Sequence, residues 1–383
     1  MKRLLLLILI MMIITSFSAF SFGETQERYI VTLFEPLNSH VIDILNAHNA
    51  KVLQKFNVIN GFVIQSNPYG LKNILKSLNI KNIEIDQEVS IEVKPNRPGK
   101  PPKDETPPDQ TIEWGIDAIN ADDVWENYSG AGVRIAIVDT GIDLSHQDLI
   151  VQDGINFVRS AKTYNDDNGH GTHVAGIVAA LNNEIGVVGV APDSEIYAVK
   201  VLNKRGIGYL SDVVLGIEWS INNNMDIINM SLSSNSPSPA LESILDIANT
   251  NGIITVAAAG NDASEINYPA AYENTICVGA IDIDSNIAYF SSFGSQMDVA
   301  APGVNVFSTY KKNTYKSLSG TSMSAPHITG LAALYLQNNS SGNLNTFRDF
   351  LIDSSTDLSP EGWDVYSGYG LPDANALIEW YDL

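Results

Sequence analysis

The feature that most constrains the fold is an alternation of short apolar runs with helical stretches, which begins near Trp114. Strands that alternate with helices imply right-handed crossovers, and so a parallel sheet covered by helices on both faces. We therefore predict an α/β domain over residues 111–383. The apolar runs that we interpret as buried strands span residues 133–138, 196–201, 226–230, 253–258 and 275–278, and the helical patterns span 170–181, 210–222 and 240–249.

A smaller unit precedes this domain. Residues 28–92 alternate strand and helix signals, with strands expected at 29–33, 58–65 and 83–93 and helices at 39–48 and 69–78. These elements predict a small α+β unit of about the minimum size for a hydrophobic core. Residues 94–108 then change in composition to Pro, Lys, Asp and Gly with almost nothing apolar, which indicates an extended, protease-accessible linker.

The first 23 residues have the pattern of a signal peptide. Lys2 and Arg3 precede an apolar run over residues 4–14, and small and polar residues follow at 16–23. The alternative is a permanent membrane anchor, because apolar residues continue as far as Phe22 and could just reach spanning length. We favour cleavage after Ser21 or Gly23, and so expect a secreted, extracellular protein with no stable membrane association.

The composition limits the function classes. The 383 residues carry a formal net charge of −22, which argues against nucleic-acid binding because phosphate neutralisation needs clustered Lys and Arg. The single cysteine, Cys277, lies in an apolar run and is expected to be a buried small hydrophobe. A secreted protein without disulfides needs another source of stability, and bound metal ions are the obvious candidate.

Three short motifs carry side chains suited to catalysis. Asp139 opens the motif DTGID directly after the strand 133–138, so it lies at the carboxyl end of that strand. His170 lies in NGHGTHVAG at the start of an apolar helix, and Ser322 lies in SGTSMSAPH at the positive N-terminal end of another helix. Each motif alone is often an N-cap, a loop or a turn. In the chain order Asp, His, Ser, the three predict a catalytic triad, in an order that differs from those of chymotrypsin and the α/β-hydrolases.

Together these motifs resemble the subtilisin-like serine protease (subtilase) family, and the resemblance runs from about residue 110 to about residue 375. It implies a mainly parallel seven-stranded sheet flanked by helices and an endopeptidase of broad specificity, which we expect to act on protein and peptide substrates as a monomer. It also divides the precursor into a signal peptide (1–23), an inhibitory propeptide of ferredoxin-like α+β fold (24–93), a linker and mature N-terminal arm (94–110) and a catalytic domain (111–383).

The resemblance also implies roles for individual residues. Ser322 would attack the peptide carbonyl, His170 would take and return the proton, and Asp139 would orient His170. Asn261 matches the family's oxyanion-binding asparagine, with the Ser322 backbone N–H as the second donor. The expected substrate-binding edges are Gly206, Ile207 and Gly208 on one side and Ser231, Leu232 and Ser233 on the other, and the primary pocket would be lined by residues 231–234 and by Ala258 and Gly260, with Asn267 near its floor.

None of these pocket residues is charged, so we expect a preference for apolar or aromatic side chains before the cut bond. The sequence departs from the family at Ser233 and Ser234, where two glycines are usual, and added side chains could narrow the pocket. Alignment with the family's propeptide puts residues 91–93 across the active site as an intramolecular inhibitor. The first cut is then expected near Val93 or Lys94, with Val93 in the primary pocket.

A calcium site is also implied by the resemblance. The loop 181–187 matches the family's tight calcium loop, which holds Ca²⁺ with hard oxygen ligands. The alternative is a simple Gly-bearing turn. A second, weaker cation site near Ala270, Tyr272 and Asp298 is a further expectation. The ligands expected at the tight site are Gln110, Asp148, Leu181, Asn183, Ile185 and Val187.

Two rival functions remain open at this point. A metal-dependent hydrolase would use His170 and His173, but no Glu lies between them as in the His-Glu-x-x-His pattern. We therefore expect His173, like His327, to be structural. A non-catalytic scaffold that retains the fold is disfavoured by the presence of the triad motifs, Asn261 and a cleavable linker together.

Overall fold

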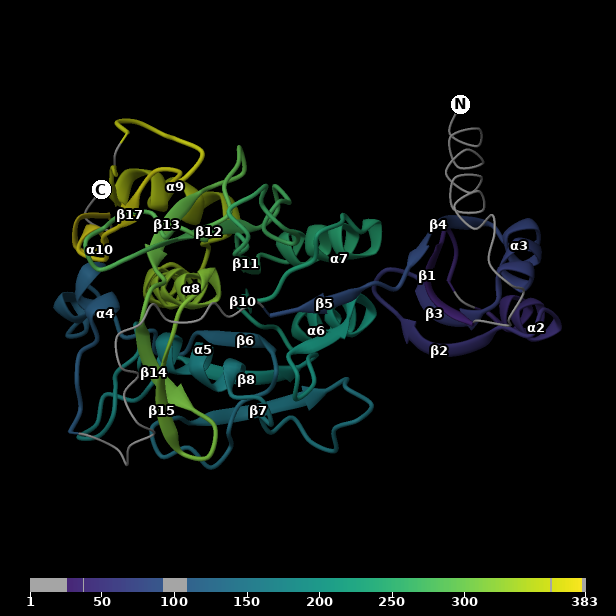
Figure 1. Ribbon diagram of the computed structural model, residues 1–383, viewed down its shortest axis with the longest axis horizontal. Coiled ribbons are helices and arrows are strands. Elements are labelled where there is room, and N and C mark those ends of the chain that lie inside the picture. Colours follow the sequence, from purple (N-terminus) through teal and green to yellow (C-terminus); the bar gives the residue numbers. More distant parts are fainter. Residues whose placement is uncertain (1–25, 37, 92–108, 359, 381–383) are drawn as a thin grey trace. The chain divides into compact units, whose positions relative to one another are not determined.

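The computed structural model describes residues 26–36, 38–91, 109–358 and 360–380 (Figure 1). The described residues fall into two compact units, which divide after Asp86. The predicted signal peptide and the linker 94–108 lie outside the described residues, as do Glu92 and Val93. The smaller unit ends at Asp86, and not near Val93 as the strand expected at 83–93 implied, because that stretch forms two separate strands.

The small unit is a four-stranded antiparallel sheet with two helices. Its elements are β1 (Glu27–Leu33), α2 (Ser39–Ala47), β2 (Lys51–Phe56), β3 (Gly61–Ser66), α3 (Pro68–Ser77) and β4 (Ile80–Ile85), with strand order β2-β3-β1-β4. The βαββαβ order is that of a ferredoxin-like unit. Both helices start at an asparagine whose side chain accepts a backbone N–H: Asn38 caps α2 and Asn67 caps α3. Leu45, Phe62 and Ile74 are fully buried in its core.

The large unit is built on a seven-stranded sheet in which every neighbouring pair of strands is parallel. This confirms the predicted α/β fold. Across the sheet the strands are β13 (Val299–Pro302), β12 (Ile276–Ile281), β11 (Ile254–Ala258), β10 (Ile227–Met230), β6 (Arg134–Asp139), β8 (Glu195–Lys200) and β7 (Val151–Asn156).

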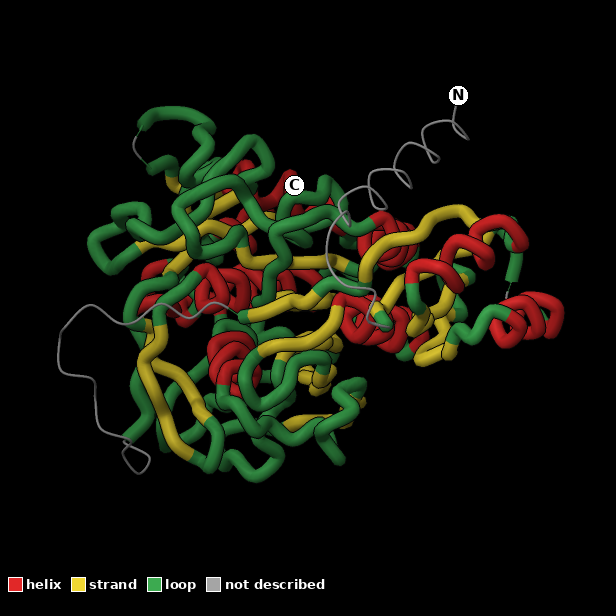
Figure 2. The backbone as a smooth tube through the Cα atoms, turned by 45° about the vertical axis from the view of Figure 1, so that its right-hand side comes forward, coloured by secondary structure: helices red, strands yellow, loops and turns green. Residues whose placement is uncertain are grey.

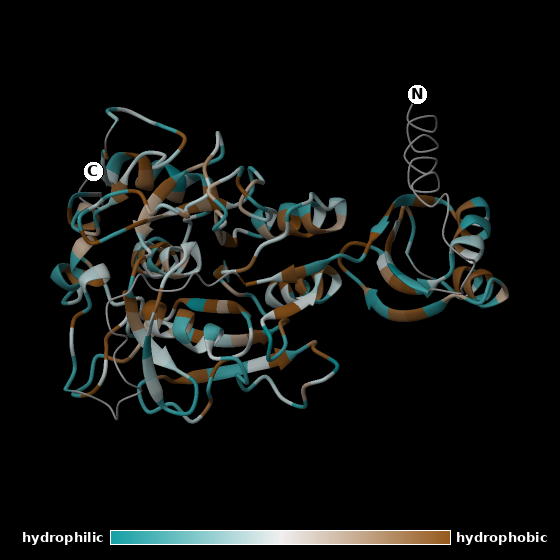
Figure 3. Ribbon diagram, in the orientation of Figure 1, coloured by the Kyte–Doolittle hydropathy of each residue, from teal (hydrophilic) through white to brown (hydrophobic). Residues whose placement is uncertain are grey.

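Helices cover both faces of this sheet, and Figure 2 shows them in red beside the yellow strands. Ile135 and Ile137 of β6 share a buried cluster with side chains of α5 (His170–Ala179), α8 (Thr321–Gln337) and α9 (Leu344–Ser354). Val138 of β6 points to the other face, where Gly216 of α6 (Leu210–Asn222) packs closely against it. Helix α7 (Pro239–Thr250) packs beside α6. The central strands β11 and β12 are buried along their whole length, and the sheet carries much of the hydrophobic colouring in Figure 3.

Shorter elements complete the large unit. They are β5 (Glu88–Ser90), α4 (Trp114–Ala118), a 3₁₀ turn (Asp122–Val124), β9 (Ile207–Tyr209), the hairpin β14 (Val306–Tyr310) and β15 (Thr314–Leu318), the pair β16 (Ser355–Thr356) and β17 (Leu371–Pro372), and α10 (Ala376–Trp380). Within the part of the chain that the structure describes, no helix is both long enough and apolar enough to cross a bilayer.

Candidate active site

Asp139 and His170 meet at the carboxyl edge of the sheet. Asp139 is the last residue of β6, and His170 is the first residue of α5. Gly169 precedes it at φ 114°, where a side chain would be strained and would run into the Tyr310 ring. His170 Nδ1 lies 2.8 and 2.9 Å from the two carboxylate oxygens of Asp139, and both side chains are buried.

The partners of the His170 ring fix its chemistry. In a neutral imidazole only one nitrogen carries a proton, and Nδ1 faces a carboxylate that can only accept. Nε2 is therefore the basic nitrogen. It is buried and has no hydrogen-bond partner among the described residues, so it is available to take a proton.

Ser322 lies in the first turn of α8, at the same edge of the sheet. Its Oγ donates to the Ser231 carbonyl at 3.2 Å, and Ser231 Oγ donates in return to the Ser322 carbonyl at 2.9 Å. The backbone N–H of Ser322 belongs to the helix terminus, where amides have no acceptor within the helix. Ser322 is thus held beside Ser231, which follows β10, at the positive end of the helix dipole.

Asn261 follows β11 and contacts the start of the same helix. Its Oδ1 accepts hydrogen bonds from Thr321 N at 2.8 Å and Thr321 Oγ1 at 3.0 Å. This pairing sets the amide orientation, because the oxygen end is committed to Thr321 and the donor end must face elsewhere. The Asn261 amide and the Ser322 N–H are donors of the kind that stabilise a developing oxyanion. Thr321, which orients the amide, was not predicted as a site residue.

A buried carboxylate that the sequence analysis missed connects the two halves of the Asp139–His170 pair. Asp166 Oδ1 accepts from Thr140 Oγ1 at 3.0 Å and from Gly169 N at 2.8 Å, and Oδ2 accepts from Thr172 Oγ1 at 2.6 Å. Burial raises the pKa of Asp166, and these hydrogen bonds oppose the rise. Asp166 therefore joins the residue after Asp139 to the first turn of α5. An Asp four residues before the motif histidine was the available signal.

Lys200 is a second buried charge that the sequence analysis missed. It pairs with Asp139 across β8 and β6 and is fully buried. Its ammonium donates to the Thr140 carbonyl, to the Leu202 carbonyl at 3.0 Å and to Asp167 Oδ1 at 2.8 Å. All three donors of the ammonium are used in this way, as a buried lysine requires.

His173 and His327 are buried structural residues. His173 Nε2 lies 2.8 Å from the Lys316 carbonyl and 3.1 Å from the Val306 carbonyl, and burial lowers its pKa to about 3. His327 Nδ1 lies 2.8 Å from the Met323 carbonyl, and burial lowers its pKa to about 4. Over the described ranges no cluster of three His, Cys, Asp or Glu side chains could hold a metal ion. The geometry therefore gives no support to a hydrolytic metal on His170 and His173.

The two expected substrate-binding edges are paired with a segment of this chain. Strand β5 runs antiparallel to β9, with Val89 opposite Gly208 and Ser90 opposite Ile207. Ser90 and Ser233 exchange two backbone hydrogen bonds, of 3.1 and 2.9 Å, and Ile91 N donates to Gly206 O at 3.0 Å. Residues 88–91 thus form the central strand between the two edges, which is how an extended peptide would be bound.

The register of this added strand identifies the position that faces the nucleophile. In an antiparallel pair each step forward on one strand is a step back on the other. If Ser90 is opposite Ser233, the position two residues later is opposite Ser231, whose carbonyl accepts from Ser322 Oγ. By this count the position would be Glu92, which, like the Val93 that the family alignment indicated, lies outside the described residues. Ile91, just before it, lines a cavity of about 290 Å³ together with His170.

The expected primary pocket lies between two backbone segments. Its walls are residues 231–234 and 258–260, and both Ser233 and Ser234 are buried. Ser234 and Tyr268 exchange backbone hydrogen bonds of 2.8 and 2.9 Å, and Asn267 N donates to Ala259 O at 2.9 Å. Residues 267–268 therefore join the two walls at the base. Ser234 Oγ donates to the Ser236 carbonyl at 3.3 Å, so this hydroxyl is engaged within its own loop.

The residues expected to bind calcium lie together around the loop 181–187. Gln110 Nε2 donates to the Leu181 carbonyl at 2.8 Å, and Asn183 Nδ2 donates to Asp148 Oδ1 at 2.9 Å. Asp148 is fully buried, and burial raises its pKa. Ile185 and Val187 are held in the same loop, since Ile185 N donates to Asn183 Oδ1 at 2.7 Å and Val187 N to Asp148 Oδ2 at 3.0 Å.

At the second expected cation site, Asp298 has a partner within the chain. Asp298 is paired with Arg348, whose Nε lies 2.7 Å from Asp298 Oδ1. The same guanidinium donates to the carbonyls of Glu273 and Thr275 at 3.0 and 3.1 Å. Arg348 therefore supplies a positive charge to the buried Asp298 carboxylate.

The fold and the site together define a class of protein. A parallel sheet presents a carboxylate, a histidine with a free basic nitrogen, and a serine at a helix N-terminus along one edge. These are the parts of a serine endopeptidase.

The chain belongs to the subtilase family, whose model matches residues 130–370. It is 42% identical over 338 residues to a thermostable alkaline protease of Halalkalibacterium halodurans, with 88% of each chain covered. It is 50% identical over 277 residues to subtilisin DY of Bacillus licheniformis, which covers 70% of this chain and 100% of the relative. It is 38% identical over 368 residues to subtilisin E of Bacillus subtilis, which covers 93% of this chain and 92% of the relative.

Proposed function

We propose that this chain is a secreted subtilisin-like endopeptidase, made as a precursor, in which Asp139, His170 and Ser322 form the catalytic triad. The observation that carries the proposal is the state of the His170 ring: Nδ1 is bonded to both oxygens of Asp139, and Nε2 is buried without a partner among the described residues. A base held in this tautomer is prepared to deprotonate a serine.

In the proposed reaction, Ser322 Oγ turns from the Ser231 carbonyl, gives its proton to His170 Nε2 and bonds to the substrate carbonyl carbon. The carbonyl oxygen becomes an oxyanion, which accepts hydrogen bonds from the Asn261 amide and the Ser322 N–H. His170 then gives its proton to the leaving amine, the C–N bond breaks and an acyl-enzyme remains. Water, deprotonated by His170, releases the acyl group and restores Ser322.

We propose that the precursor cuts itself, and that residues 24–92 then act as an inhibitor. The backbone pairing of residues 88–91 with both substrate edges supports this, because a product held by these bonds competes with substrate. The register favours Glu92 over Val93 as the residue before the cut bond. The uncharged walls of the primary pocket support broad specificity with a preference for apolar or aromatic side chains.

We also propose that Ca²⁺ stabilises the mature enzyme. The ion would be held by main-chain oxygens of Leu181, Ile185 and Val187 and by side-chain oxygens of Gln110, Asp148 and Asn183. The donor set fits, because carbonyl, amide and carboxylate oxygens are the ligands that Ca²⁺ prefers. The buried Asp148 carboxylate, with its raised pKa, would gain a compensating positive charge. The ion would stabilise the fold and take no part in the reaction.

The test is labelling with a fluorophosphonate, which bonds covalently to an activated serine, in the parent and in Ser322→Ala. We expect labelling at Ser322 alone, and no proteolysis and an uncut precursor in the variant, since losing the nucleophile costs many orders of magnitude in rate. Ser324→Ala, two residues further along α8, is the matched control and should still label. Normal maturation of Ser322→Ala expressed alone would refute self-cleavage, and a protein that neither labels nor cuts any peptide would be a scaffold and not an enzyme.

A further inference from the structure

The base of the primary pocket carries an unsatisfied hydrogen-bond donor. Asn267 is only 7% exposed, and its Nδ2 has no hydrogen-bond partner within the described residues. Its backbone is fixed between the two pocket walls, because Asn267 N donates to Ala259 O and the next residue, Tyr268, pairs with Ser234. A buried donor without an acceptor costs free energy, so the side chain gains from any acceptor that reaches it.

A second polar group lies beside the first. Ser292 Oγ is also buried and unpartnered in the described part of the chain, and Ser292 N donates to Gly260 O at 3.0 Å. A Cβ atom built on Gly260 would lie 2.7 Å from Asn267 Nδ2 and 2.9 Å from Ser292 Oγ. The two donors therefore border the same point next to Gly260, a residue of the pocket wall.

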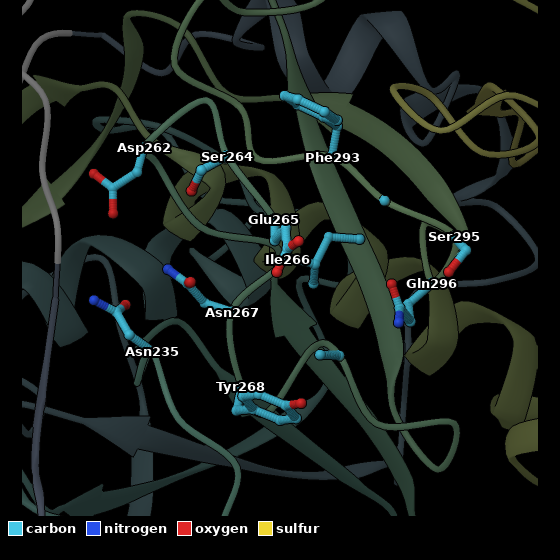
Figure 4. A pocket seen from close by; sticks show the side chains of 12 residues that line it. Asn235, Asp262, Ser264, Glu265, Ile266, Asn267, Tyr268, Phe293, Ser295 and Gln296 are labelled. Carbon is cyan, nitrogen blue, oxygen red and sulfur yellow. The ribbon is translucent and has the colours of Figure 1, made fainter.

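The surrounding cavity shows which side of Asn267 is open. Asn267 lines a cavity of about 650 Å³, and in Figure 4 its amide points towards the space between Asn235 and Asp262. Asp262 and Glu265, both exposed, also line this cavity. A negatively charged ligand would be repelled there, whereas a neutral acceptor would not.

We propose, on the basis of the endopeptidase function proposed above, that the primary pocket selects side chains that end in an acceptor oxygen. The expected walls, residues 231–234 and 258–260, accept an apolar or aromatic stem, and Asn267 with Ser292 binds the oxygen at its tip. Tyr is therefore preferred over Phe, and Gln over Met, because each pair has a similar size and differs in that oxygen. Glu is accepted less well than Gln because of Asp262.

The experiment measures kcat/KM for four peptides that are identical except for Tyr, Phe, Gln or Met before the cut bond. We expect Tyr over Phe and Gln over Met by about five- to tenfold, the effect of one hydrogen bond of typical net strength. Asn267→Ala and Asn267→Leu should bring both ratios close to one, and Ser292→Ala should lower them in part. Asn235→Ala, which removes an exposed amide from the outer cavity, is the matched control and should keep both ratios.

Each ratio is measured within one enzyme preparation, so a variant that folds poorly still reports its selectivity. Wild-type ratios near one, or ratios that survive both Asn267 substitutions, would overturn the inference while leaving the endopeptidase in place. If none of the four peptides is cut and Ser322 is not labelled by a fluorophosphonate, the proposed function itself fails. The two failures are thus distinguishable.

Discussion

Asp148→Asn tests the proposed calcium site most directly. The buried carboxylate of Asp148 accepts hydrogen bonds from Asn183 Nδ2, Val187 N and Tyr315 Oη, at 2.9, 3.0 and 3.1 Å. These hydrogen bonds bring only partial positive charges to the carboxylate, so burying its full negative charge still costs free energy. The raised pKa of Asp148 reflects that cost. A bound cation would remove that cost, and an asparagine in place of Asp148 would bind the cation far less well.

The expected magnitude follows from linkage. An ion bound only by the folded state stabilises it by RT ln(1 + [L]/Kd), about 2.7 kcal/mol at a hundredfold excess over Kd. For a domain of this size 1 kcal/mol shifts Tm by roughly 2–4 °C, so saturating calcium should raise the Tm of the parent by about 5–10 °C. Asp148→Asn should lose most of that calcium-dependent rise.

The assay is a calcium titration of Tm, run on mature enzyme whose nucleophile is blocked with a fluorophosphonate so that autolysis does not interfere. Tyr315→Phe is the matched control, because it removes one hydrogen bond from the same carboxylate but no expected ligand. The control should lower Tm by a similar amount with calcium and with chelator, and so keep the calcium-dependent rise. If Asp148→Asn rises with calcium as much as the parent does, the site assignment is wrong.

Two further predictions concern catalysis and acid stability. Asn261→Leu should lower kcat by about 10²–10³ with little change in KM, because the amide stabilises the oxyanion and does not bind the substrate before reaction. A loss of kcat below tenfold would show that Asn261 does not have that role. Burial lowers the pKa of His173 to about 3 and of His327 to about 4, from 6.5, so below pH 6.5 the unfolded chain binds protons that the folded chain does not. The free energy of unfolding, measured with urea, should therefore fall as the pH falls from 6.5, by about 2 kcal/mol per histidine at pH 5, and a flat profile would contradict this reasoning.

The interior of the sheet could be predicted from the sequence, and its edges could not. The five predicted strands correspond to β6, β8, β10, β11 and β12, which have neighbours on both sides and read as continuous apolar runs. The two strands that were missed, β7 and β13, are the two edges. Strand β7 carries the exposed residues Gln152 and Asp153, and β13 is only four residues long, so neither has the periodicity of a buried strand.

The motif residues were found because each follows a strand or starts a helix, but the groups that support them were not. Asp166 and Lys200 are charged, and charged residues are ordinarily expected at the surface. They are buried here because their partners come from other segments: Asp166 bonds to Thr140, and Lys200 bonds to the carbonyls of Thr140 and Leu202. Such partners depend on the folded backbone, and no local pattern in the sequence indicates them.

The register of β5 could not be predicted from the sequence, for a related reason. Alignment fixes which segment crosses the active site, but the pairing of Ser90 with Ser233 is set by two backbone hydrogen bonds, which the sequence does not reveal. One step of register matters, because successive residues of a strand point to opposite faces. Extended by two residues, the register of β5 favours Glu92 over Val93 opposite Ser231, and so favours an acceptor oxygen over an apolar side chain before the proposed cut bond.

The same backbone groups that hold β5 explain how the proposed precursor could be both substrate and inhibitor. While the chain is intact, residues 88–91 are covalently part of the enzyme, so their effective concentration at the two edges is high and independent of dilution. The proposed cut after Glu92 lies outside residues 88–91, so it would leave the pairings of Ser90 with Ser233 and of Ile91 with Gly206 unchanged. The cut changes the entropy that the fragment gains on dissociation, because the freed fragment can now diffuse away from the enzyme. Inhibition would therefore outlast the cut itself, and it would end only when the fragment dissociates or is degraded.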